Sequence, residues 1–289
     1  MMARILEIDE IAPAFKRYLI HEPVIARRHR AGQFVMILIH DHAERIPLTI
    51  ADSDAVRGTI TLVVQEVGKT TMEMGELAPG DSITVVGPLG KPTHIENLGT
   101  CVCIGGGAGI APLLPIARAL REAGNHVVSI LGGRTLELVI LRLEMEAASD
   151  EIHYTTDDGS LGAKGMVTHA LDRYIEVSGR PDMVVAIGPA IMMRAVAEQT
   201  RPLEIPTMVS LNTIMVDGTG MCGGCRVRVD GENRFVCVDG PEFDAHAVDF
   251  DRMMQRQRIF LEQEEEARRR FLTAHLCRAA AAGGQVHGT

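Results

Sequence analysis

The chain contains no tryptophan, and aromatic residues make up only 3% of its 289 residues. Few side chains are therefore available to stack on bases or sugars. Acidic residues outnumber basic ones, the formal net charge is −9, and basic residues gather only in a short run near the C-terminus. We do not expect nucleic acid as a partner, because such binding depends on an extended basic surface.

Long apolar runs are also missing. Stretches such as 101–104 and 183–187 are long enough for buried strands but far too short to span a membrane. The N-terminal residues alternate like a strand and lack the apolar core of a secretory signal. With 46% hydrophobic and 23% charged residues, the composition is typical of a folded globular protein. We expect a cytoplasmic protein.

Short strand-like runs dominate residues 1–98. They are β-branched or aliphatic, are separated by glycine, proline and aspartate, and lie at 18–20, 34–39, 60–67 and 82–86. Short strands at this spacing are typical of an antiparallel β-barrel. One helix-like segment, residues 69–77, interrupts them.

The rhythm changes at Gly99, where apolar strands begin to alternate with helical segments. Strands are predicted at 101–104, 127–131, 152–155, 183–187 and 207–210, with helices in most of the gaps. This alternation predicts a doubly wound α/β domain with a parallel sheet over 99–211.

Two further segments follow the α/β region. Residues 212–249 are rich in glycine and cysteine and are expected to form a small module, and residues 250–289 form a polar helical tail. Met253, Phe260, Ala267 and Phe271 recur on a rough helical stripe of this tail. The stripe favours docking, either on a partner or on the chain's own domains.

A glycine-rich loop opens the α/β region, in the sequence Cys101-Val-Cys-Ile-Gly-Gly-Gly-Ala-Gly-Ile-Ala-Pro112. Glycines let the backbone approach a pyrophosphate, and the free amides at the start of the next helix attract its charge. Ile110 stands where the dinucleotide fingerprint has its last glycine or alanine. A tight turn is the alternative, but the strand before and the helix after favour phosphate binding.

Three more loops follow predicted strands of the same sheet: Gly132-Gly-Arg-Thr135, Thr156-Asp-Asp-Gly-Ser160 and Gly188-Pro189. Ligands of open α/β sheets bind at the carboxyl ends of the strands. Each loop alone could be an ordinary turn, but together they outline one crevice.

In the barrel region, the candidate flavin-binding segments are Arg45-Ile-Pro-Leu-Thr-Ile50 and Gly68-Lys-Thr-Thr71. An arginine and hydroxyls beside a strand, with a glycine at a helix start, suit a phosphate-bearing flavin. Because aromatic residues are scarce, such a flavin would be held mainly by backbone, hydroxyl and aliphatic groups. Taken alone, the segments also fit a hydrophobic strand followed by a capped helix.

Three of the six cysteines fall in one short segment, where Cys222-Gly-Gly-Cys225 is followed by Cys237. In a cytoplasmic chain such a group indicates metal or redox chemistry before structural disulfides. The plant-type [2Fe–2S] pattern places a further ligand five residues before Cys222, and that position is Asp217.

Zinc is the competing metal. Zinc modules usually bring two C-x-x-C pairs or histidines, whereas this segment has one pair, a lone Cys237 and only His246 nearby. The spacing favours an iron–sulfur cluster held by Asp217, Cys222, Cys225 and Cys237. Asp217 could instead cap its own loop, with Cys277 or a residue outside the module as the fourth ligand.

The barrel, the loop Gly105-Gly-Gly-Ala-Gly-Ile-Ala-Pro112 and the cysteine module occur in an order that resembles the ferredoxin–NADP reductase superfamily. Within it, the segments Arg45–Asp52, Thr156–Ser160 and Cys222–Cys225 resemble two groups. These groups are the electron-transfer subunits of dihydroorotate dehydrogenase and the small subunits of NADH-dependent reduced ferredoxin:NADP oxidoreductase. The dihydroorotate group carries four cysteines, so Asp217 in the first position favours the second group.

The resemblance implies which residues bind the cofactors. FAD contacts would come from Arg45, Pro47, Leu48, Thr49 and Thr70, next to Gly68 and Thr71 at the helix start, and the nucleotide site would contain Gly106, Gly107, Gly109, Arg134 and Asp157. The flavin carries the chemistry, so no catalytic acid or base is expected.

The predicted function is that of an oxidoreductase subunit in a heterodimer. It would exchange hydride between NAD(H) and FAD and pass electrons through a [2Fe–2S] cluster to a larger flavin/iron–sulfur subunit. The paired acids Asp157 and Asp158 favour NAD(H) over NADP(H), since a 2′-phosphate would be repelled unless Arg134 reaches it. The alternatives are a dihydroorotate dehydrogenase electron-transfer subunit, a self-sufficient reductase, and a zinc-containing binding protein without redox chemistry.

Overall fold

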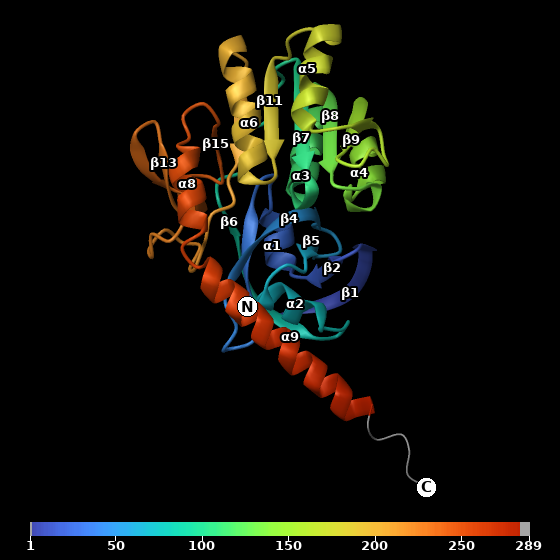
Figure 1. Ribbon diagram of the computed structural model, residues 1–289, viewed down its shortest axis with the longest axis vertical. Coiled ribbons are helices and arrows are strands. Elements are labelled where there is room, and N and C mark those ends of the chain that lie inside the picture. The colour runs from blue at the N-terminus through green and yellow to red at the C-terminus, as the bar shows by residue number, and fades with distance from the viewer. Residues whose placement is uncertain (1, 284–289) are drawn as a thin grey trace.

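The computed structural model consists of a barrel and, above it, a sheet flanked by helices (Figure 1). The structure describes residues 2–283, with side chains up to residue 275. Among these residues no helix has both the length and the apolar character needed to cross a bilayer.

Six strands close into the barrel in the order β1-β2-β5-β4-β3-β6, and every neighbouring pair is antiparallel. Its interior is filled mainly by isoleucine, leucine and valine, because alternate side chains of a strand point to the same face. The strands are β1 (Met2–Ala12), β2 (Phe15–His21), β3 (Phe34–Leu38), β4 (Ile46–Asp54), β5 (Thr59–Gln65) and β6 (Ser82–Leu89). Two short helices, α1 (Pro23–Arg28) and α2 (Lys69–Gly75), lie between them.

The second part is a seven-stranded sheet in the order β10-β9-β8-β7-β11-β12-β15. All its neighbouring strands are parallel except the edge strand β15, which runs antiparallel to β12. The strands are β7 (Thr100–Gly106), β8 (His126–Gly133), β9 (Glu151–Thr156), β10 (Ala163–Lys164), β11 (Met183–Ile187), β12 (Thr207–Ser210) and β15 (Glu242–Asp244). The order reverses between β7 and β11, as in doubly wound folds.

Helices cover both faces of this sheet. Helix α3 (Ile110–Glu122) packs on one face with α4 (Arg142–Ala147), and α5 (Val167–Ser178) and α6 (Ala190–Thr200) pack on the other. Short 3-10 turns complete the connections: η1 (Gly107–Gly109), η2 (Leu136–Leu138) and η3 (Arg201–Leu203). The antiparallel barrel and the doubly wound sheet confirm the fold class predicted for these regions.

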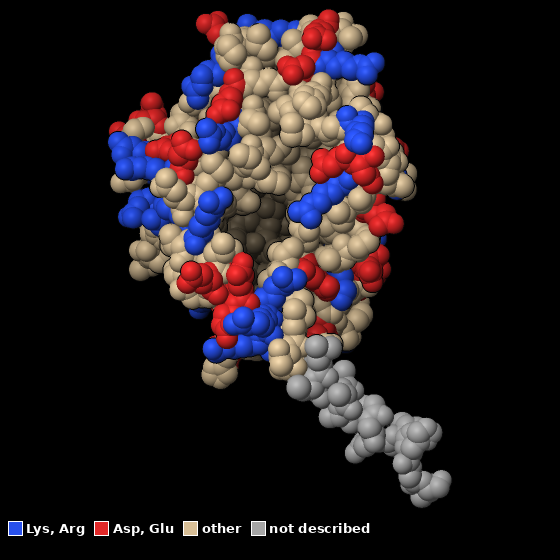
Figure 2. Space-filling view, viewed as in Figure 1, with Lys and Arg blue, Asp and Glu red and all other residues tan. Residues whose placement is uncertain are grey.

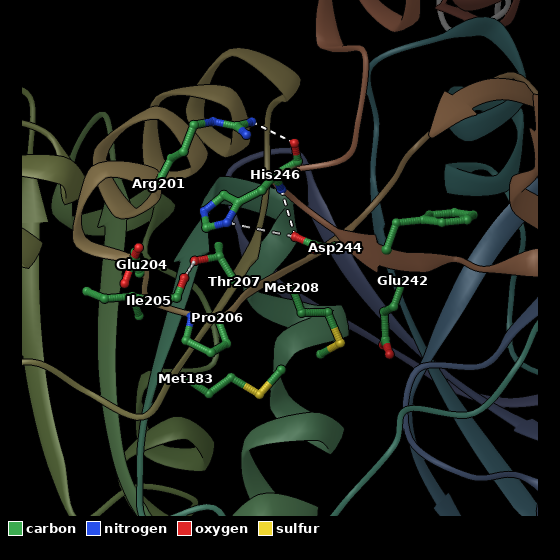
Figure 3. A pocket seen from close by; sticks show the side chains of 11 residues that line it. Met183, Arg201, Glu204, Ile205, Pro206, Thr207, Met208, Glu242, Asp244 and His246 are labelled. Carbon is green, nitrogen blue, oxygen red and sulfur yellow. Dashed lines mark hydrogen bonds and ion pairs between the residues drawn. The ribbon is translucent and has the colours of Figure 1, made fainter. Parts of the chain in front are cut away.

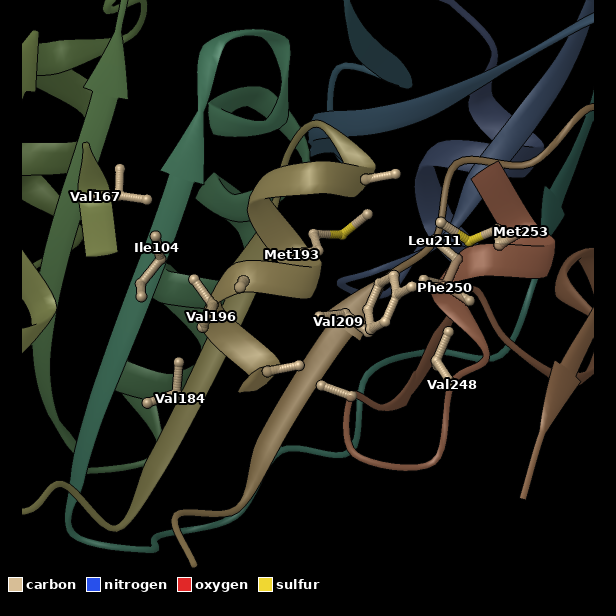
Figure 4. Close-up of a cluster of buried hydrophobic side chains, with 14 of the residues drawn as sticks. Ile104, Val167, Val184, Met193, Val196, Val209, Leu211, Val248, Phe250 and Met253 are labelled. Carbon is tan, nitrogen blue, oxygen red and sulfur yellow. The ribbon is translucent and has the colours of Figure 1, made fainter. Parts of the chain in front are cut away.

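The cysteine-rich region forms a small module beside both parts. It contains the hairpin of β13 (Arg226–Val229) and β14 (Glu232–Phe235), and the short helix α7 (Val236–Asp239). Helix α8 (Phe250–Gln257) follows, and its Phe250 and Met253 pack with Leu211 and Val209 in an apolar core that reaches the parallel sheet (Figure 4). The module and the α/β domain therefore share one core.

The last helix, α9 (Leu261–Gly283), leaves this core and extends away from the body of the molecule (Figure 1). It passes beside α2, where the His275 Nδ1 atom lies 2.8 Å from the Glu76 carboxylate. Phe260 and Leu261, which precede and begin the helix, are about half exposed.

Candidate cofactor-binding and cluster-binding sites

The nucleotide crevice lies at the carboxyl ends of β7 and β11. Gly106 ends β7, and the single turn η1 joins it to α3. Gly107 adopts φ +55° and has open space where a side chain would stand. At Gly109 a Cβ atom would collide with the carbonyl oxygen of Ile187 in β11. The loop therefore needs glycine twice, once for its backbone conformation and once for its contact with the neighbouring strand.

The structure also explains the departure of this loop from the dinucleotide fingerprint. Ile110 is fully buried at the start of α3, where the fingerprint has a small residue. A Cβ atom on Gly105 would lie 3.0 Å from the Ile110 side chain. The close approach of helix and strand is thus retained, with the small residue on the strand rather than on the helix.

The loops after β8 and β9 bring Arg134 and Asp157 together. The Asp157 N–H donates to the Gly133 carbonyl at 3.1 Å, and the Asp158 N–H donates to the Arg134 carbonyl at 3.3 Å. The hydroxyl and N–H of Ser160 donate to the Asp158 carboxylate, and these bonds hold its pKa below the usual range. Among the described residues, the exposed Arg134 guanidinium has no hydrogen-bond or ion-pair partner.

The flavin segment lies on a half-open stretch of β4. Residues 46–49 pair with β3, whereas pairing with β5 begins only at Ile50. Within the described residues, no strand pairs with the other side of Pro47, Leu48 and Thr49, so backbone groups there are available to a ligand. This arrangement suits the backbone and aliphatic contacts expected for a flavin in a chain with few aromatics.

Helix α2 approaches the same stretch. The Thr70 hydroxyl donates to the Glu44 carboxylate at 3.5 Å, which brings the two predicted flavin segments together. The Thr71 hydroxyl is occupied within its own turn, where it accepts from the N–H groups of Val67 and Gly68 at 3.0 Å each. Thr71 therefore shapes the helix start.

The flavin segment and the nucleotide crevice face each other across the domain boundary. Turn η1 contacts β5, and Arg118 of α3 forms an ion pair with Asp52 of β4 at 2.7 Å. The space-filling view shows a hollow between the barrel and the overlying sheet (Figure 2). A flavin and a nicotinamide ring can meet in such a position.

Two of the predicted cluster ligands already touch. Cys225 and Cys237 are buried, and their Sγ atoms lie 3.2 Å apart. Burial, together with the bond to Cys225, raises the pKa of the Cys237 thiol to about 12. Cys222 is exposed, and its Sγ atom accepts the Gly224 N–H at 3.4 Å. Cys101 and Cys103 are buried in β7, and the side chain of Cys277 lies outside the described residues.

Asp217 stands at the entrance of the cysteine loop. Its two carboxylate oxygens accept the N–H groups of Thr219 and Cys222, each at 2.7 Å, and these bonds lower its pKa. The capping contacts that were the alternative to ligation are therefore present. A carboxylate has about four lone-pair directions, so the two backbone bonds leave room for a metal bond.

The donor set fits a two-iron cluster better than a single ion. Within the described part of the chain, no three histidine, cysteine or acidic side chains converge closely enough to hold one metal ion. Tetrahedral zinc needs four donors around one centre. A [2Fe–2S] cluster divides its four ligands between two irons, so one close thiol pair and two more distant donors match it.

Met36 links the flavin segment to the cysteine loop. It pairs with Pro47 across the β3–β4 ladder. The Met36 side chain lies against Gly218, where a Cβ atom would stand 2.6 Å from the Met36 Cγ atom, so only glycine allows this approach. Met36 carries no sequence signal of its own, because an apolar strand residue is unremarkable until the fold places it.

A cavity of about 660 Å³ lies elsewhere, beginning at the amino ends of β11 and β12 (Figure 3). It contains none of the predicted site residues. On its wall, Arg201 donates to the His246 carbonyl and the His246 N–H donates to the Asp244 carboxylate, whereas Glu242 stands apart from them (Figure 3). We assign this cavity no part in the cofactor sites.

A barrel with a half-open strand, a doubly wound sheet with a glycine loop and an adjoining cysteine module together define a flavin- and nicotinamide-dependent oxidoreductase with an iron–sulfur centre. The family comparisons agree. Residues 5–94 match the oxidoreductase FAD-binding domain, and residues 103–198 match the oxidoreductase NAD-binding domain. Residues 212–249 match the iron–sulfur cluster binding domain of dihydroorotate dehydrogenase B, which decides against the zinc alternative.

Whole-chain relatives give the family. The chain is 48% identical over 256 residues to the dihydroorotate dehydrogenase B (NAD(+)) electron transfer subunit homolog of Thermotoga maritima, covering 88% of this chain and 90% of that protein. It is 36% identical to the electron transfer subunit of Bacillus caldolyticus, covering 78% and 89%. The chain therefore belongs to the family of dihydroorotate dehydrogenase B electron transfer subunits and their homologues.

Solved structures agree with this assignment. A chain from the structure of NADH-dependent reduced ferredoxin-NADP oxidoreductase matches with a TM-score of 0.89 and 45% identity, covering 94% of this chain and 98% of that chain. Amycolatopsis cytochrome P450 reductase matches with a TM-score of 0.58 and 23% identity, covering 71% and 66%, and shows the shared fold alone. This chain is an electron-transfer subunit with FAD-, NAD- and iron–sulfur-binding domains.

Proposed function

We propose that this chain takes electrons from NAD(H) at the glycine loop and delivers them singly, through FAD and a [2Fe–2S] cluster, to a larger flavin/iron–sulfur subunit. The observation that carries the proposal is the position of Met36, which pairs with Pro47 of the flavin segment through the strand ladder and places its side chain against Gly218 of the cysteine loop. When bound, FAD supplies the step from hydride to single electrons, and the cluster supplies their onward transfer. The chain's own residues need only bind, orient and exclude water.

The proposed FAD site combines two segments. Pro47, Leu48 and Thr49 offer the free side of β4, and Arg45 offers a cation for phosphate. Gly68, Thr70 and Thr71 form the helix start opposite, where Gly68 has open space around it. Together they hold the flavin by backbone, hydroxyl and charge.

The proposed nucleotide site uses the crevice between β7 and β11. Gly106, Gly107 and Gly109 let the pyrophosphate approach the backbone, and Arg134 and Asp157 flank the ribose end. The dense hydrogen bonding between the Arg134 and Asp157 loops supports one rigid binding edge there.

The proposed cluster ligands are Asp217, Cys222, Cys225 and Cys237. The buried pair Cys225 and Cys237 would bind by releasing thiol protons, as thiolate ligands do. Asp217 would bind through a free lone pair while its backbone bonds fix the loop.

An apolar face around this loop supports transfer to another subunit. Val216 is 55% exposed, Met221 89% and Val238 38%, and all three adjoin predicted ligands. Exposed apolar side chains around an electron exit suit a protein partner. We place the complex in the cytoplasm, where a thiolate-held cluster is protected from competing disulfide formation.

Two partners are compatible with this face. The names of the whole-chain relatives point to dihydroorotate dehydrogenase B. Asp217 in place of a first cysteine, together with the structural match at 45% identity, favours the NADH-dependent ferredoxin:NADP oxidoreductase type.

We propose that the chain divides into four segments, with boundaries at 1–98, 99–211, 212–249 and 250–289. The family matches fall inside the first three segments, which supports those limits. Helix α8 shares the core of the cysteine module, so the last boundary separates residues that pack together.

The test is to isolate the native complex and determine its cofactors and its second subunit. We expect FAD, iron and sulfide in this chain and copurification of a larger oxidoreductase subunit. Met221→Asp should weaken recovery of that subunit. Val177→Asp, which also places a carboxylate at an exposed apolar residue, in this case on α5, should not. A colourless chain that purifies alone and contains zinc would refute the proposal.

A further inference from the structure

The last turn of α8 holds the cysteine module at two points. Gln257 donates its side-chain N–H to the Asn212 carbonyl at 2.5 Å, where the module begins. The neighbouring Arg256 donates to the Gly224 carbonyl at 3.2 Å. Buried Phe250 and Met253 fix the helix on the apolar core, so these two donors come from a rigid element.

Gly224 is the residue through which Arg256 reaches the predicted ligands. It lies between Cys222 and Cys225, and its own N–H donates to the Cys222 Sγ atom at 3.4 Å. A guanidinium bound to the Gly224 carbonyl therefore restrains the turn that presents both thiols. Partners of this kind orient ligands and tune the centre that the ligands hold.

Arg256 also brings a positive charge. Its side chain is partly buried, and among the described residues no carboxylate pairs with it. Arg252, one turn earlier on the same helix, is 60% exposed and lies 3.8 Å from Asp249. A partly buried, unpaired cation is weakly screened and favours the more negative, reduced form of a nearby iron–sulfur centre.

We propose that Arg256 is a positioning residue of the iron–sulfur module. It anchors the Cys222–Cys225 turn and raises the reduction potential of the cluster. This inference rests on the proposed function, because it assumes that Cys222, Cys225 and Cys237 ligate the cluster. Arg256 lies outside the matched iron–sulfur domain, residues 212–249, which ends before α8.

The test compares full-length variants in the native complex. The midpoint potential of the cluster is measured by anaerobic titration followed by EPR, and the rate of iron loss is measured with a chelator. Arg256→Gln removes the charge, Arg256→Lys keeps it, and Arg252→Gln is the matched control on the exposed side of α8. The wild-type chain is measured first.

We expect Arg256→Gln to lower the equilibrium constant for one-electron reduction by three- to tenfold, a shift of up to about 59 mV, and to speed iron loss. Arg256→Lys should stay closer to the wild type, and Arg252→Gln should match it. An unmoved potential in Arg256→Gln, or an equal shift in Arg252→Gln, would overturn the inference.

If Arg256→Gln purifies without iron, the other two variants test the inference. Arg256→Lys supports it by retaining iron with a near-native potential. If Arg252→Gln also loses its iron, the inference is overturned. A wild-type chain without an iron–sulfur signal would instead refute the proposed function.

Discussion

Asp217 is the residue on which the cluster type depends. Its carboxylate is held by two backbone N–H groups, and it stands where a plant-type pattern has its first cysteine. We expect Asp217→Ala to make the cluster labile and Asp217→Cys to keep it with a shifted potential, because a carboxylate is a harder ligand for iron than a thiolate. Iron content, spectrum and potential unchanged in Asp217→Ala would remove Asp217 from the site.

Asp157 and Asp158 set the expected nucleotide preference. Both lie at the end of β9, and the bonds from Ser160 keep the Asp158 carboxylate ionised. A 2′-phosphate would meet this charge, so we expect the specificity constant for NADH to exceed that for NADPH by about tenfold or more. Diaphorase assays with both nucleotides measure it, and a higher specificity constant for NADPH would contradict the expectation. Asp157→Asn should reduce the ratio of the specificity constant for NADH to that for NADPH.

Glu242 joins three parts of the molecule. It begins β15, accepts the Thr93 hydroxyl at 2.7 Å and lies against Gly32 of the barrel. Burial raises the pKa of its carboxyl from 4.5 to about 7. Between these two values the folded chain keeps a proton that the unfolded chain has lost, so the contribution of Glu242 to stability falls as pH rises from 4.5 to 7.

Between pH 4.5 and 7, the expected decrease in unfolding free energy from Glu242 is on the order of 3 kcal/mol at most. Glu242→Gln should remove this pH dependence, whereas Glu122→Gln at an exposed site of α3 should not. His29 acts in the opposite sense, because burial lowers its pKa to about 4 and favours the fold as pH rises from 4 to 6.5. The test is the difference in unfolding free energy between the wild type and Glu242→Gln, measured by denaturant unfolding across the pH range, rather than either curve alone. A constant difference from pH 4.5 to 8 would show that Glu242 stays ionised.

At the scale of elements, the tail divides into two helices with different roles. The apolar stripe of the tail is compatible with docking on a partner or on the chain's own domains, and the structure places its Met253 in the chain's own core. Up to residue 275, the side chains of helix α9 are largely exposed, and His275 contacts Glu76 at the end of α2.

We expect a chain ending at residue 260 to keep FAD and iron but to recover less partner subunit. A chain ending at residue 249 should lose iron as well, because it lacks Phe250, Met253 and Arg256. Iron, flavin and partner recovery are measured for both. Both truncations remove Cys277. Retained iron in the chain that ends at residue 260 therefore excludes Cys277 as a ligand, whereas loss of iron from that chain would contradict the assignment of Asp217.

Most elements follow from local pattern. The runs 101–104 and 183–187 form β7 and β11, since buried parallel strands are apolar throughout. The hairpin of β13 and β14 was not predicted, because four-residue strands with charged side chains resemble a loop. Contacts such as Thr93 with Glu242, or Arg256 with Gly224, join residues 149 and 32 positions apart and have no local signal.

The same limit applies to the candidate site. Glycine loops and cysteine spacing identify the chemistry because few residue types serve it. Met36, and the contact of Gly105 with Ile110, escape notice because an apolar strand residue and a strand glycine have many ordinary uses. Their roles follow only from the packing of β3 against the cysteine loop and of β7 against α3.

At the scale of the whole molecule, the barrel, the parallel sheet and the cysteine module meet around one region. Arg118 and Asp52 join the first two, and Met36 with Gly218 joins the barrel to the module. The arrangement leads from the nucleotide crevice through the flavin segment to an exposed apolar face. We expect electrons to follow this order.

Anaerobic titration of the purified native complex with NADH, followed in one sample by visible absorption and EPR, tests that claim most directly. We expect NADH to bleach the flavin absorption and an EPR signal of a reduced [2Fe–2S] cluster to appear with it. A complex whose flavin stays oxidised under NADH, or whose EPR spectrum shows no iron–sulfur signal under NADH or a stronger reductant, would contradict it.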